Sequence, residues 1–336
     1  MQVWAVRRPG PAHLQPMDLE QRAIPRPGRG EVLVEVAACA VCRTDLHLAE
    51  GDLSPRRPGV VPGHEVVGRI VDVGAGVAPT RAGERVGIGW LRRTCGHCAR
   101  CLSGSENLCH DSLYTGWDAD GGFAHYAVAP DDFVHVLPPG YTDVEAAPLL
   151  CAGIIGWRAL RRAQLPERGR LGLYGFGAAA HLTMQVAISE GHRVHVMTRG
   201  ANARALATAL GAASVGDPTA RPPEPLDAAI IFAPAGELVP PAMEALDDAG
   251  TVVCAGIHMS AIPALDYTRH VFRERQLRSV TANTRSDARD FLAAVSRSRV
   301  QVRTTVYAFA DAARALEDLA ADRLDGVAVL DVGARG

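Results

Sequence analysis

The sequence predicts an α/β protein with a doubly wound parallel sheet in the middle of the chain and β-rich stretches on either side. Three observations support this fold class. Residues 30–40 and 60–90 alternate short apolar runs with Gly and Pro, as in Glu31–Val36, which is typical of short strands joined by turns. Residues 171–254 alternate strand-like and helix-like runs at short range. Roughly the last fifty residues return to a mixed pattern.

The middle of the chain reads as a succession of β-α-β units. We expect strands at Leu171–Tyr174, Arg193–Met197, Ala228–Phe232 and Thr251–Cys254, and helices at Ala178–Glu190 and Ala201–Leu210, the second ended by Gly211. Such alternation predicts a parallel sheet covered on both faces. Further along, the pattern predicts a helix at about Asp311–Asp322 and a final strand at Val327–Leu330. Asp217–Pro225 contains four prolines and is expected to be a surface loop.

Composition bounds the class of protein. The 336 residues suffice for two domains, and 48% hydrophobic with 21% charged residues is the balance of a globular chain rather than a disordered one. The net charge of −2 gives no reason to expect a nucleic-acid or anionic-membrane partner. No apolar run reaches membrane-spanning length, and Met1–Arg8 does not resemble a signal peptide. We therefore expect a cytoplasmic protein.

All 35 basic residues are arginines, and the chain has no lysine. This excludes dehydrogenases that use a tyrosine–lysine pair and enzymes that need a Schiff-base lysine. If the protein performs hydride chemistry, a metal or a histidine must therefore handle the substrate oxygen.

Four of the eight cysteines, Cys95, Cys98, Cys101 and Cys109, have the spacing C-x-x-C-x-x-C-x7-C. Four thiolates within fifteen residues can close a tetrahedral shell around zinc and leave no position open, which is typical of a structural site. An iron–sulfur cluster uses similar spacings and is the nearest alternative. The other alternative is four unrelated core thiols.

Cys42 and His64 lie 22 positions apart, and Cys151 stands outside the four-cysteine cluster. Together they offer two sulfurs and one nitrogen, which is the ligand number of a catalytic zinc with its fourth position open to water or substrate. The spacing alone leaves equal room for a core histidine and two free thiols.

A glycine-rich turn, Gly175–Ala180, follows the first predicted strand of the middle region and begins a helix. In this context the run G-x-G-x-x-A predicts binding of a dinucleotide pyrophosphate at the helix N-terminus. The predicted contact residues are Gly175, Phe176, Gly177, Ala178, Ala179 and Ala180, where Ala180 replaces the third glycine of the motif.

The second strand ends at Met197-Thr198-Arg199, and no carboxylate stands at this end. An Asp or Glu at this position would accept hydrogen bonds from the adenosine ribose and repel a 2′-phosphate. Thr198 and Arg199 therefore favour NADP(H) over NAD(H), and Arg204 is a possible second partner of the phosphate. The alternative is a solvent-facing Arg199 and a site that accepts either cofactor.

Taken in order, these pieces resemble the zinc-containing alcohol dehydrogenases of the medium-chain dehydrogenase/reductase superfamily. The most specific stretches are Val61–Glu65, the four-cysteine cluster, Gly121–Ala124 and Cys151–Ile154, and the stretch from Trp90 to Cys109 resembles the yeast-type and bacterial branch. The resemblance implies a Rossmann domain inserted in a GroES-like, β-rich catalytic domain. The implied bounds are 1–147 with a structural-zinc lobe at about 90–112, then 148–278 for the Rossmann domain and 279–336 for the return to the catalytic domain.

The resemblance also implies roles for single residues. Cys42, His64 and Cys151 match the ligands of the catalytic zinc, so that two zinc ions per chain are expected. Near them, Asp45 matches the acid that orients the histidine ligand, Glu65 a carboxylate close to the metal, Thr44 the hydroxyl that binds the alcohol, and His47 the end of a proton relay. Arg43 matches a partner of the cofactor phosphate, and Gly256 and Arg285 complete the expected cofactor-binding set.

The implied reaction is reversible hydride transfer between a small primary or secondary alcohol and NAD(P), with zinc as Lewis acid. Leu53, Trp90 and Ile155 are the expected pocket residues, and they predict a rather roomy, apolar pocket. Three alternatives stay open: a cinnamyl- or polyol-type zinc dehydrogenase with a different pocket, a zinc-free quinone or enone reductase, and a non-catalytic zinc-binding or redox-sensing protein. A homodimer or homotetramer is expected.

Overall fold

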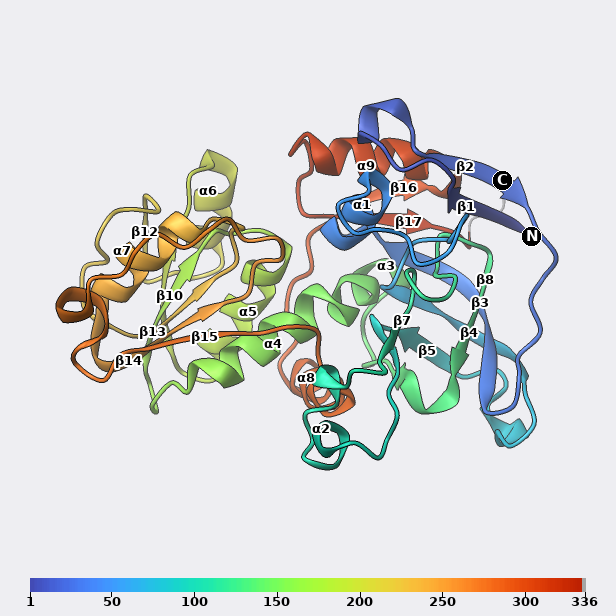
Figure 1. Ribbon diagram of the computed structural model, residues 1–336, viewed down its shortest axis with the longest axis horizontal. Helices are drawn as coiled ribbons and strands as arrows, with labels where there is room; N and C mark the ends of the chain where they lie inside the picture. Colours follow the sequence, from blue (N-terminus) through green and yellow to red (C-terminus); the bar gives the residue numbers. More distant parts are fainter. Residues whose placement is uncertain (334–336) are drawn as a thin grey trace. The chain divides into compact units, whose positions relative to one another are not determined.

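The computed structural model describes residues 1–333, and the chain forms two compact units (Figure 1). The first unit contains Met1–Cys151, Ala282–Ser296 and the chain from Val302 onward, and the second contains Ala152–Thr281 and Arg297–Gln301. The units thus divide after residue 151 rather than 147, and the chain returns to the first unit after residue 281 rather than 278. Among residues 1–333, no helix is both long and apolar enough to cross a bilayer.

The first unit is built around a seven-stranded sheet with the order β16-β17-β3-β4-β5-β9, in which β8 also pairs with β3. β3 is central because its first half pairs antiparallel with β8 and its last residues pair with β17. The C-terminal strand therefore completes a sheet begun by the N-terminal part of the chain. The strands of this unit are β1 (Gln2–Val6), β2 (Met17–Gln21), β3 (Glu31–Ala40), β4 (Val66–Val73), β5 (Arg85–Ile88), β6 (Leu91–Arg93), β7 (Leu113–Tyr114), β8 (Tyr126–Pro130), β9 (Val134–Val136), β16 (Thr304–Ala308) and β17 (Val327–Asp331).

Short helices connect these strands. Alternating side chains of β3, including Val32, Val34 and Val36, are buried in the main core of the unit, which fixes the face that β3 turns inward. The α-helices are α1 (Arg43–Glu50), α2 (Ala99–Leu102), α3 (Asp143–Ala146), α8 (Arg285–Arg297) and α9 (Ala312–Ala320). Single 3-10 turns lie at Ala12–Leu14, Pro79–Arg81, Glu106–Leu108, Asp131–Phe133, Ala147–Leu150 and Phe309–Asp311.

The second unit is a six-stranded parallel sheet with the order β12-β11-β10-β13-β14-β15. The chain runs outward from β10 in one direction and then restarts at β13 in the other, so that a topological switch point lies between β10 and β13. The strands are β10 (Arg170–Tyr174), β11 (Arg193–Met197), β12 (Ser214–Gly216), β13 (Leu226–Ile231), β14 (Leu246–Cys254) and β15 (Gln276–Ser279). The helices are α4 (Ala152–Ala163), α5 (Ala178–Ser189), α6 (Ala201–Ala209) and α7 (Val239–Glu244), with a 3-10 turn at Gly236–Leu238 and a π-helical turn at Tyr267–Val271.

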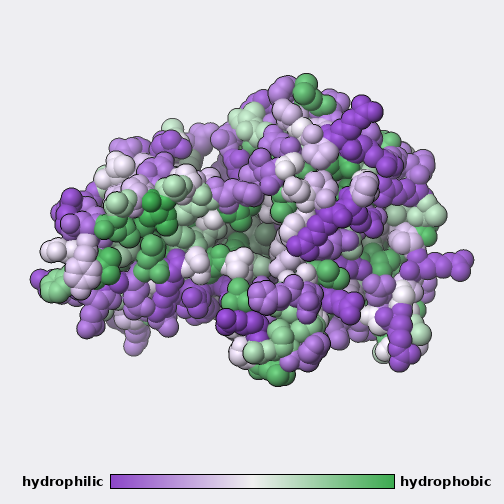
Figure 2. Space-filling model, viewed as in Figure 1, coloured by the Kyte–Doolittle hydropathy of each residue, from purple (hydrophilic) through white to green (hydrophobic). Residues whose placement is uncertain are grey.

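These bounds confirm the predicted fold class. The predicted strands and helices are present with ends that differ by at most two residues, except that β3 ends four residues later and β14 begins five residues earlier than predicted. Central strands such as β13 read as continuous apolar runs because both faces of the sheet are covered. The Pro-rich stretch from residue 217 to 225 contains no helix or strand, as predicted. On the face in Figure 2, hydrophilic side chains cover most of both units, and hydrophobic ones gather in smaller patches.

Candidate functional site

The N-terminus of α1 presents the predicted catalytic run. Cys42 is the N-cap, and its backbone N–H donates to the Asp45 carboxylate over 2.9 Å. A carboxylate in the first turn stabilises a helix because it pairs with otherwise unsatisfied N–H groups. Gly51 ends the helix in the left-handed region at φ 96°. The helix therefore begins at a predicted metal ligand and holds the side chains that follow it in fixed directions.

His64 is held by the same carboxylate. Asp45 Oδ1 lies 3.0 Å from His64 Nδ1 and also accepts the backbone N–H of Gly63 at 2.9 Å. Gly63 has φ 97°, and a Cβ there would come within 2.6 Å of the Phe123 ring, so that only glycine fits this turn. His64 is fully buried, and its Nε2 has no partner within residues 1–333. An Nδ1–H bonded to Asp45 leaves the Nε2 lone pair available as a ligand.

Cys42, His64, Glu65 and Cys151 come together, with one potential ligand atom from each lying within 4.8 Å of the others. A hydrogen bond from the Cys151 thiol lowers the pKa of Cys42 well below its usual range, and the same bond raises the pKa of Cys151. Burial raises the pKa of Glu65, whose Oε2 is also without a partner in the described part of the chain. Two half-buried thiols, a buried imidazole nitrogen and a buried, unsatisfied carboxylate within 4.8 Å of one another fit zinc.

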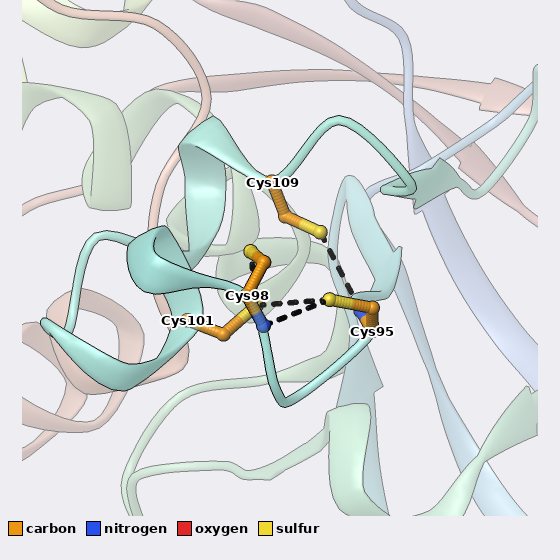
Figure 3. Close-up of side chains that lie close together, drawn as sticks. All are labelled: Cys95, Cys98, Cys101 and Cys109. Atoms are coloured by element: carbon orange, nitrogen blue, oxygen red, sulfur yellow. Dashed lines mark hydrogen bonds between the residues drawn. The ribbon is translucent and has the colours of Figure 1, made fainter.

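The four-cysteine cluster forms a second group, in the lobe around α2 (Figure 3). Cys95 Sγ lies 3.9 Å from Cys101 Sγ, and Cys98 Sγ lies 3.6 Å from Cys101 Sγ. A zinc tetrahedron with bonds of about 2.3 Å has edges of about 3.8 Å, so these separations fit the metal. Backbone N–H groups of His97 and Cys98 lower the pKa of Cys95 to about 6. All eight cysteines are free thiols.

The structure gives Arg285 a contact that the sequence analysis did not foresee. Arg285 begins α8, and its guanidinium binds the Glu106 carboxylate through Nε and Nη2, the latter at 2.7 Å, while its backbone N–H donates to the same group at 2.8 Å. Glu106 lies in the cysteine lobe between Cys101 and Cys109. The Arg285 side chain, which was expected to contact the cofactor, instead binds Glu106 and so connects the cysteine lobe to α8.

The predicted relay residues lie on α1. Thr44 Oγ1 is 3.9 Å from Cys42 Sγ, and His47 follows three positions later, on the same side of the helix. His47 Nδ1 lies 2.9 Å from the carboxylate of Asp52, a partner that the sequence analysis did not name. Arg43, expected at the cofactor phosphate, is exposed and forms an ion pair with Asp322.

Trp90 belongs to a cluster of aromatic rings that we call the aromatic wall, which consists of Trp90, Tyr114 and Trp117. Trp90 contacts the imidazole of His64 edge-on, with ring centroids 4.9 Å apart. It stacks on Tyr114 at 4.9 Å and on Trp117 at 6.0 Å. Tyr114 and Trp117 were missed because nothing in their spacing marks them; only the folded chain brings them to Trp90. Of the other expected pocket residues, Leu53 follows α1 and Ile155 lies on α4, and both are partly exposed.

The glycine-rich turn joins β10 to α5. Gly175 has φ 84°, and a Cβ there would come within 2.9 Å of the backbone of Ala233. Gly177 differs because its φ of −107° is open to any residue and a Cβ there would meet nothing within 4 Å. No side chain caps the first turn of α5, so the backbone N–H groups of Ala178, Ala179 and Ala180 have no side-chain acceptor. Glycine at position 177 thus leaves space beside N–H groups that no side chain caps, which fits a pyrophosphate.

The end of β11 carries the residues expected to select the cofactor. Thr198 is buried and Arg199 is exposed. Arg204 bends back to the carbonyl of Thr198 at 2.8 Å and forms an ion pair with Asp217. Arg199 has no ion pair or hydrogen bond within residues 1–333, so it is the unneutralised cation at this position. Gly256 follows β14, where a Cβ would lie 2.9 Å from the carbonyl oxygen of Ala233.

Comparisons with known proteins agree with these features. Residues 28–139 match the family described as the alcohol dehydrogenase GroES-like domain. A probable alcohol dehydrogenase from Mycobacterium tuberculosis is 57% identical over 335 residues, which cover 98% of this chain and 97% of that protein.

Two solved structures share the fold over almost their whole length. A cinnamyl alcohol dehydrogenase from Sorghum bicolor has a TM-score of 0.89 and 26% identity, covering 100% of this chain and 98% of that one. A thermostable alcohol dehydrogenase from Pyrobaculum aerophilum, solved with cobalt and zinc bound, has a TM-score of 0.87 and 26% identity, covering 98% and 99%.

Proposed function

Since this chain belongs to the zinc-containing alcohol dehydrogenases of the medium-chain dehydrogenase/reductase superfamily, we propose that it interconverts primary alcohols with aldehydes, and also secondary alcohols with ketones. It is a zinc-dependent oxidoreductase that uses NAD or NADP and acts on small molecules. One observation carries the proposal: two thiols and the buried His64 Nε2, which has no partner within residues 1–333, lie within 4.8 Å of one another, and three such ligands would leave a fourth zinc position for a substrate oxygen.

Cys42, His64 and Cys151 would hold the catalytic zinc, with Glu65 as a further carboxylate beside it. The bound ion would supply Lewis-acid polarisation of the substrate oxygen. Asp45, 3.0 Å from His64 Nδ1, would keep the imidazole proton on Nδ1, so that His64 would bind the metal through Nε2 as a neutral ligand. Absorbance at 340 nm with NAD or NADP and a panel of alcohols, on protein of known metal content, tests the activity. Metal-loaded, folded protein that oxidises no alcohol and reduces no aldehyde would refute it.

For the proton we propose a path along α1. Thr44 Oγ1 would accept the proton of the substrate hydroxyl and give up its own hydroxyl proton, and His47, whose Nδ1 lies 2.9 Å from Asp52, would pass that proton to solvent. His47→Gln should then slow alcohol oxidation most below neutral pH, where release of the proton is hardest. An unchanged pH profile of chemistry-limited turnover would place the path elsewhere.

We further propose a structural zinc bound by Cys95, Cys98, Cys101 and Cys109, which gives two zinc ions per chain. The sulfur separations of 3.6 and 3.9 Å support it. Elemental analysis of freshly purified protein should give two zinc ions. Substitution of Cys151 should leave one of them, and so should substitution of Cys98. One zinc or none in fully active protein would contradict the two-site assignment.

We propose a preference for NADP(H). Arg199 stands at the end of β11 without a neutralising carboxylate, and each charge-assisted bond to a 2′-phosphate would contribute about 1.5–3 kcal/mol. Arg204 would contribute less, because Asp217 already neutralises it. The ratio of kcat/KM for NADP and NAD tests this in wild type and Arg199→Ala. Preference for NAD that Arg199→Ala leaves unchanged would contradict it.

We propose that the chain forms a homodimer or homotetramer. β15 lies at the edge of its sheet, and large hydrophobic side chains around it are exposed, among them Ile257, Tyr267, Phe272 and Leu277. An open strand edge beside exposed apolar residues is a surface that a second copy can cover. Sedimentation equilibrium measures the mass, and a monomer at micromolar concentration would contradict the proposal.

A cinnamyl-type activity is the second candidate. It is favoured by the aromatic wall beside His64, because flat rings stack well on indole and phenol faces. A kcat/KM for cinnamyl alcohol well above that for 1-butanol supports this candidate, and the reverse order supports a general aliphatic enzyme.

A further inference from the structure

The loop Gly51–Pro58, here the 51–58 loop, starts at the end of α1 and is tied to His47. The backbone N–H groups of Gly51 and Leu53 both donate to the His47 carbonyl oxygen at 3.0 Å, and Asp52 binds the His47 imidazole. The loop therefore carries both the partner of the proposed relay histidine and the proposed pocket residue Leu53. Within residues 1–333, Ser54–Pro58 make no hydrogen bond between backbone groups. Side-chain contacts must position this part of the loop.

Those contacts come from the segment that carries Trp117. Its indole Nε1 donates to the carbonyl oxygen of Ser54 at 2.9 Å. Arg56 places its guanidinium 3.7 Å from the centre of the Trp117 ring and donates to Asp118 at 2.7 Å. The same Asp118 accepts the backbone N–H of Tyr114 at 2.8 Å. The loop is thus tied to the segment 114–120 by one hydrogen bond and one cation–π contact, both to Trp117, and by two ion pairs, Arg56 with Asp118 and Arg57 with Asp120.

Trp117 links this fastening to the metal ligand. Its ring stacks on Trp90 at an interplanar angle of 11°, and Trp90 contacts His64. One face of the proposed pocket is therefore the aromatic wall, and the loop that bears Leu53 is bound to that wall through Trp117. If the loop moves away, the distance between Leu53 and Trp90 grows and a bulkier substrate fits.

We propose that Trp117 is a positioning residue, which holds the 51–58 loop against the aromatic wall and thereby limits the size of substrate that the pocket accepts. This role rests on the proposed function, since it requires that Leu53 and Trp90 line a substrate pocket. Arg56 and Asp118 support this role, because their ion pair holds the loop to the same segment. The indole N–H is the specific group, because phenylalanine at this position would keep a ring for both Arg56 and Trp90 but could not bind Ser54.

Trp117→Phe is the test, and Trp4→Phe is its matched control. Trp4 Nε1 also donates to a carbonyl oxygen at 2.9 Å, that of Phe309, and none of its hydrogen bonds involves the 51–58 loop. Loss of one such bond changes an equilibrium by about five-fold. Trypsin cleavage of the native protein between Arg56 and Arg57 should accelerate by about five-fold in Trp117→Phe and stay unchanged in Trp4→Phe. This readout does not depend on activity.

The second measurement is substrate discrimination. The ratio of kcat/KM for benzyl alcohol to that for 1-naphthalenemethanol should fall by about five-fold in Trp117→Phe, chiefly through KM, and stay at the wild-type value in Trp4→Phe. An unchanged cleavage rate would overturn the proposal, since the loop would then be held by other contacts. Faster cleavage with an unchanged ratio would also overturn it, because the loop would not limit the pocket. Wild-type protein that oxidises neither alcohol would instead refute the proposed function, and this role with it.

Discussion

Replacing Asp45 with asparagine should weaken zinc binding at the Cys42, His64 and Cys151 site by about 10- to 100-fold. The carboxylate is 2% exposed and accepts three hydrogen bonds, from Cys42 N, Gly63 N and His64 Nδ1. Asparagine can keep the two bonds to Oδ1, but its amide then points N–H groups at the N–H of Cys42. One charge-assisted bond is lost, and the other two weaken.

The magnitude follows from these contacts. Loss of one hydrogen bond to a buried charged group costs about 1.5–3 kcal/mol of unfolding free energy. A 10- to 100-fold loss of metal affinity corresponds to about 1.4–2.7 kcal/mol. The loss of unfolding free energy should appear as a lower midpoint of urea unfolding, in metal-free and in zinc-loaded protein. The loss of zinc affinity should appear in competition with a chromophoric zinc chelator. Activity at saturating zinc should fall as well, because His64 is less well oriented.

Asp72→Asn is the control for this substitution. Asp72 is exposed on β4 and bonds only a neighbouring backbone N–H at 2.9 Å, so the same isosteric change should leave zinc affinity unaltered and stability within about 0.5 kcal/mol of wild type. A zinc affinity of Asp45→Asn equal to that of Asp72→Asn would refute the reasoning that this carboxylate orients the histidine ligand.

Three further predictions concern other parts of the chain. Cys98→Ser should remove one zinc and lower the thermal midpoint, while the structurally separate ligands around His64 keep theirs; equal loss of both metals on elemental analysis would contradict this. Gly177→Val should reduce dinucleotide affinity at least ten-fold with little change in stability, because a steric conflict of about 1.4 kcal/mol with the bound cofactor is enough for a ten-fold loss. Gly175→Ala should instead destabilise the fold, because Gly175 has a positive φ and no space for a Cβ. Fluorescence titration measures the affinity, and urea unfolding measures the stability. Burial lowers the pKa of His135 to about 4, whereas this histidine takes up its proton near pH 6.5 in the unfolded chain. The free energy of unfolding should therefore fall by up to about 3 kcal/mol between pH 6.5 and 4. His135→Phe should abolish this part of the pH dependence in urea unfolding, and an unaltered dependence would show that it has another origin.

Local patterns in the sequence were sufficient to predict much of the fold. The elements of the second unit follow from runs such as Arg193–Met197, where the apolar residues and the turn signals around them leave one interpretation. The four-cysteine cluster was predictable because its ligands are close in sequence, so that the spacing itself describes the geometry. Gly177 was predictable for a similar reason: the strand before it and the helix after it define the turn.

Contacts between distant segments could not be predicted in the same way. Arg285 was assigned to the cofactor, but its guanidinium is taken by Glu106, which lies 179 positions away. The stacking of Trp117 on Trp90 joins two segments 27 positions apart. The bond between His47 and Asp52 is local, but it depends on the left-handed turn at Gly51, which the sequence analysis did not predict. No periodicity or spacing encodes these pairs, because long-range side-chain partners are chosen by tertiary packing.

The short distances between the sulfur atoms of the four-cysteine cluster also make these thiols sensitive to oxidation in air. Cys98 Sγ lies 3.6 Å from Cys101 Sγ, and the lowered pKa of Cys95, about 6, keeps much of that thiol in its reactive thiolate form at neutral pH wherever no metal binds it. Such neighbours oxidise readily to a disulfide, which no longer binds the metal. The proposed structural zinc would therefore protect these thiols from oxidation as well as brace the lobe, and exposure to a chelator in air should cause a loss of zinc binding that only a reductant, added before the metal, reverses.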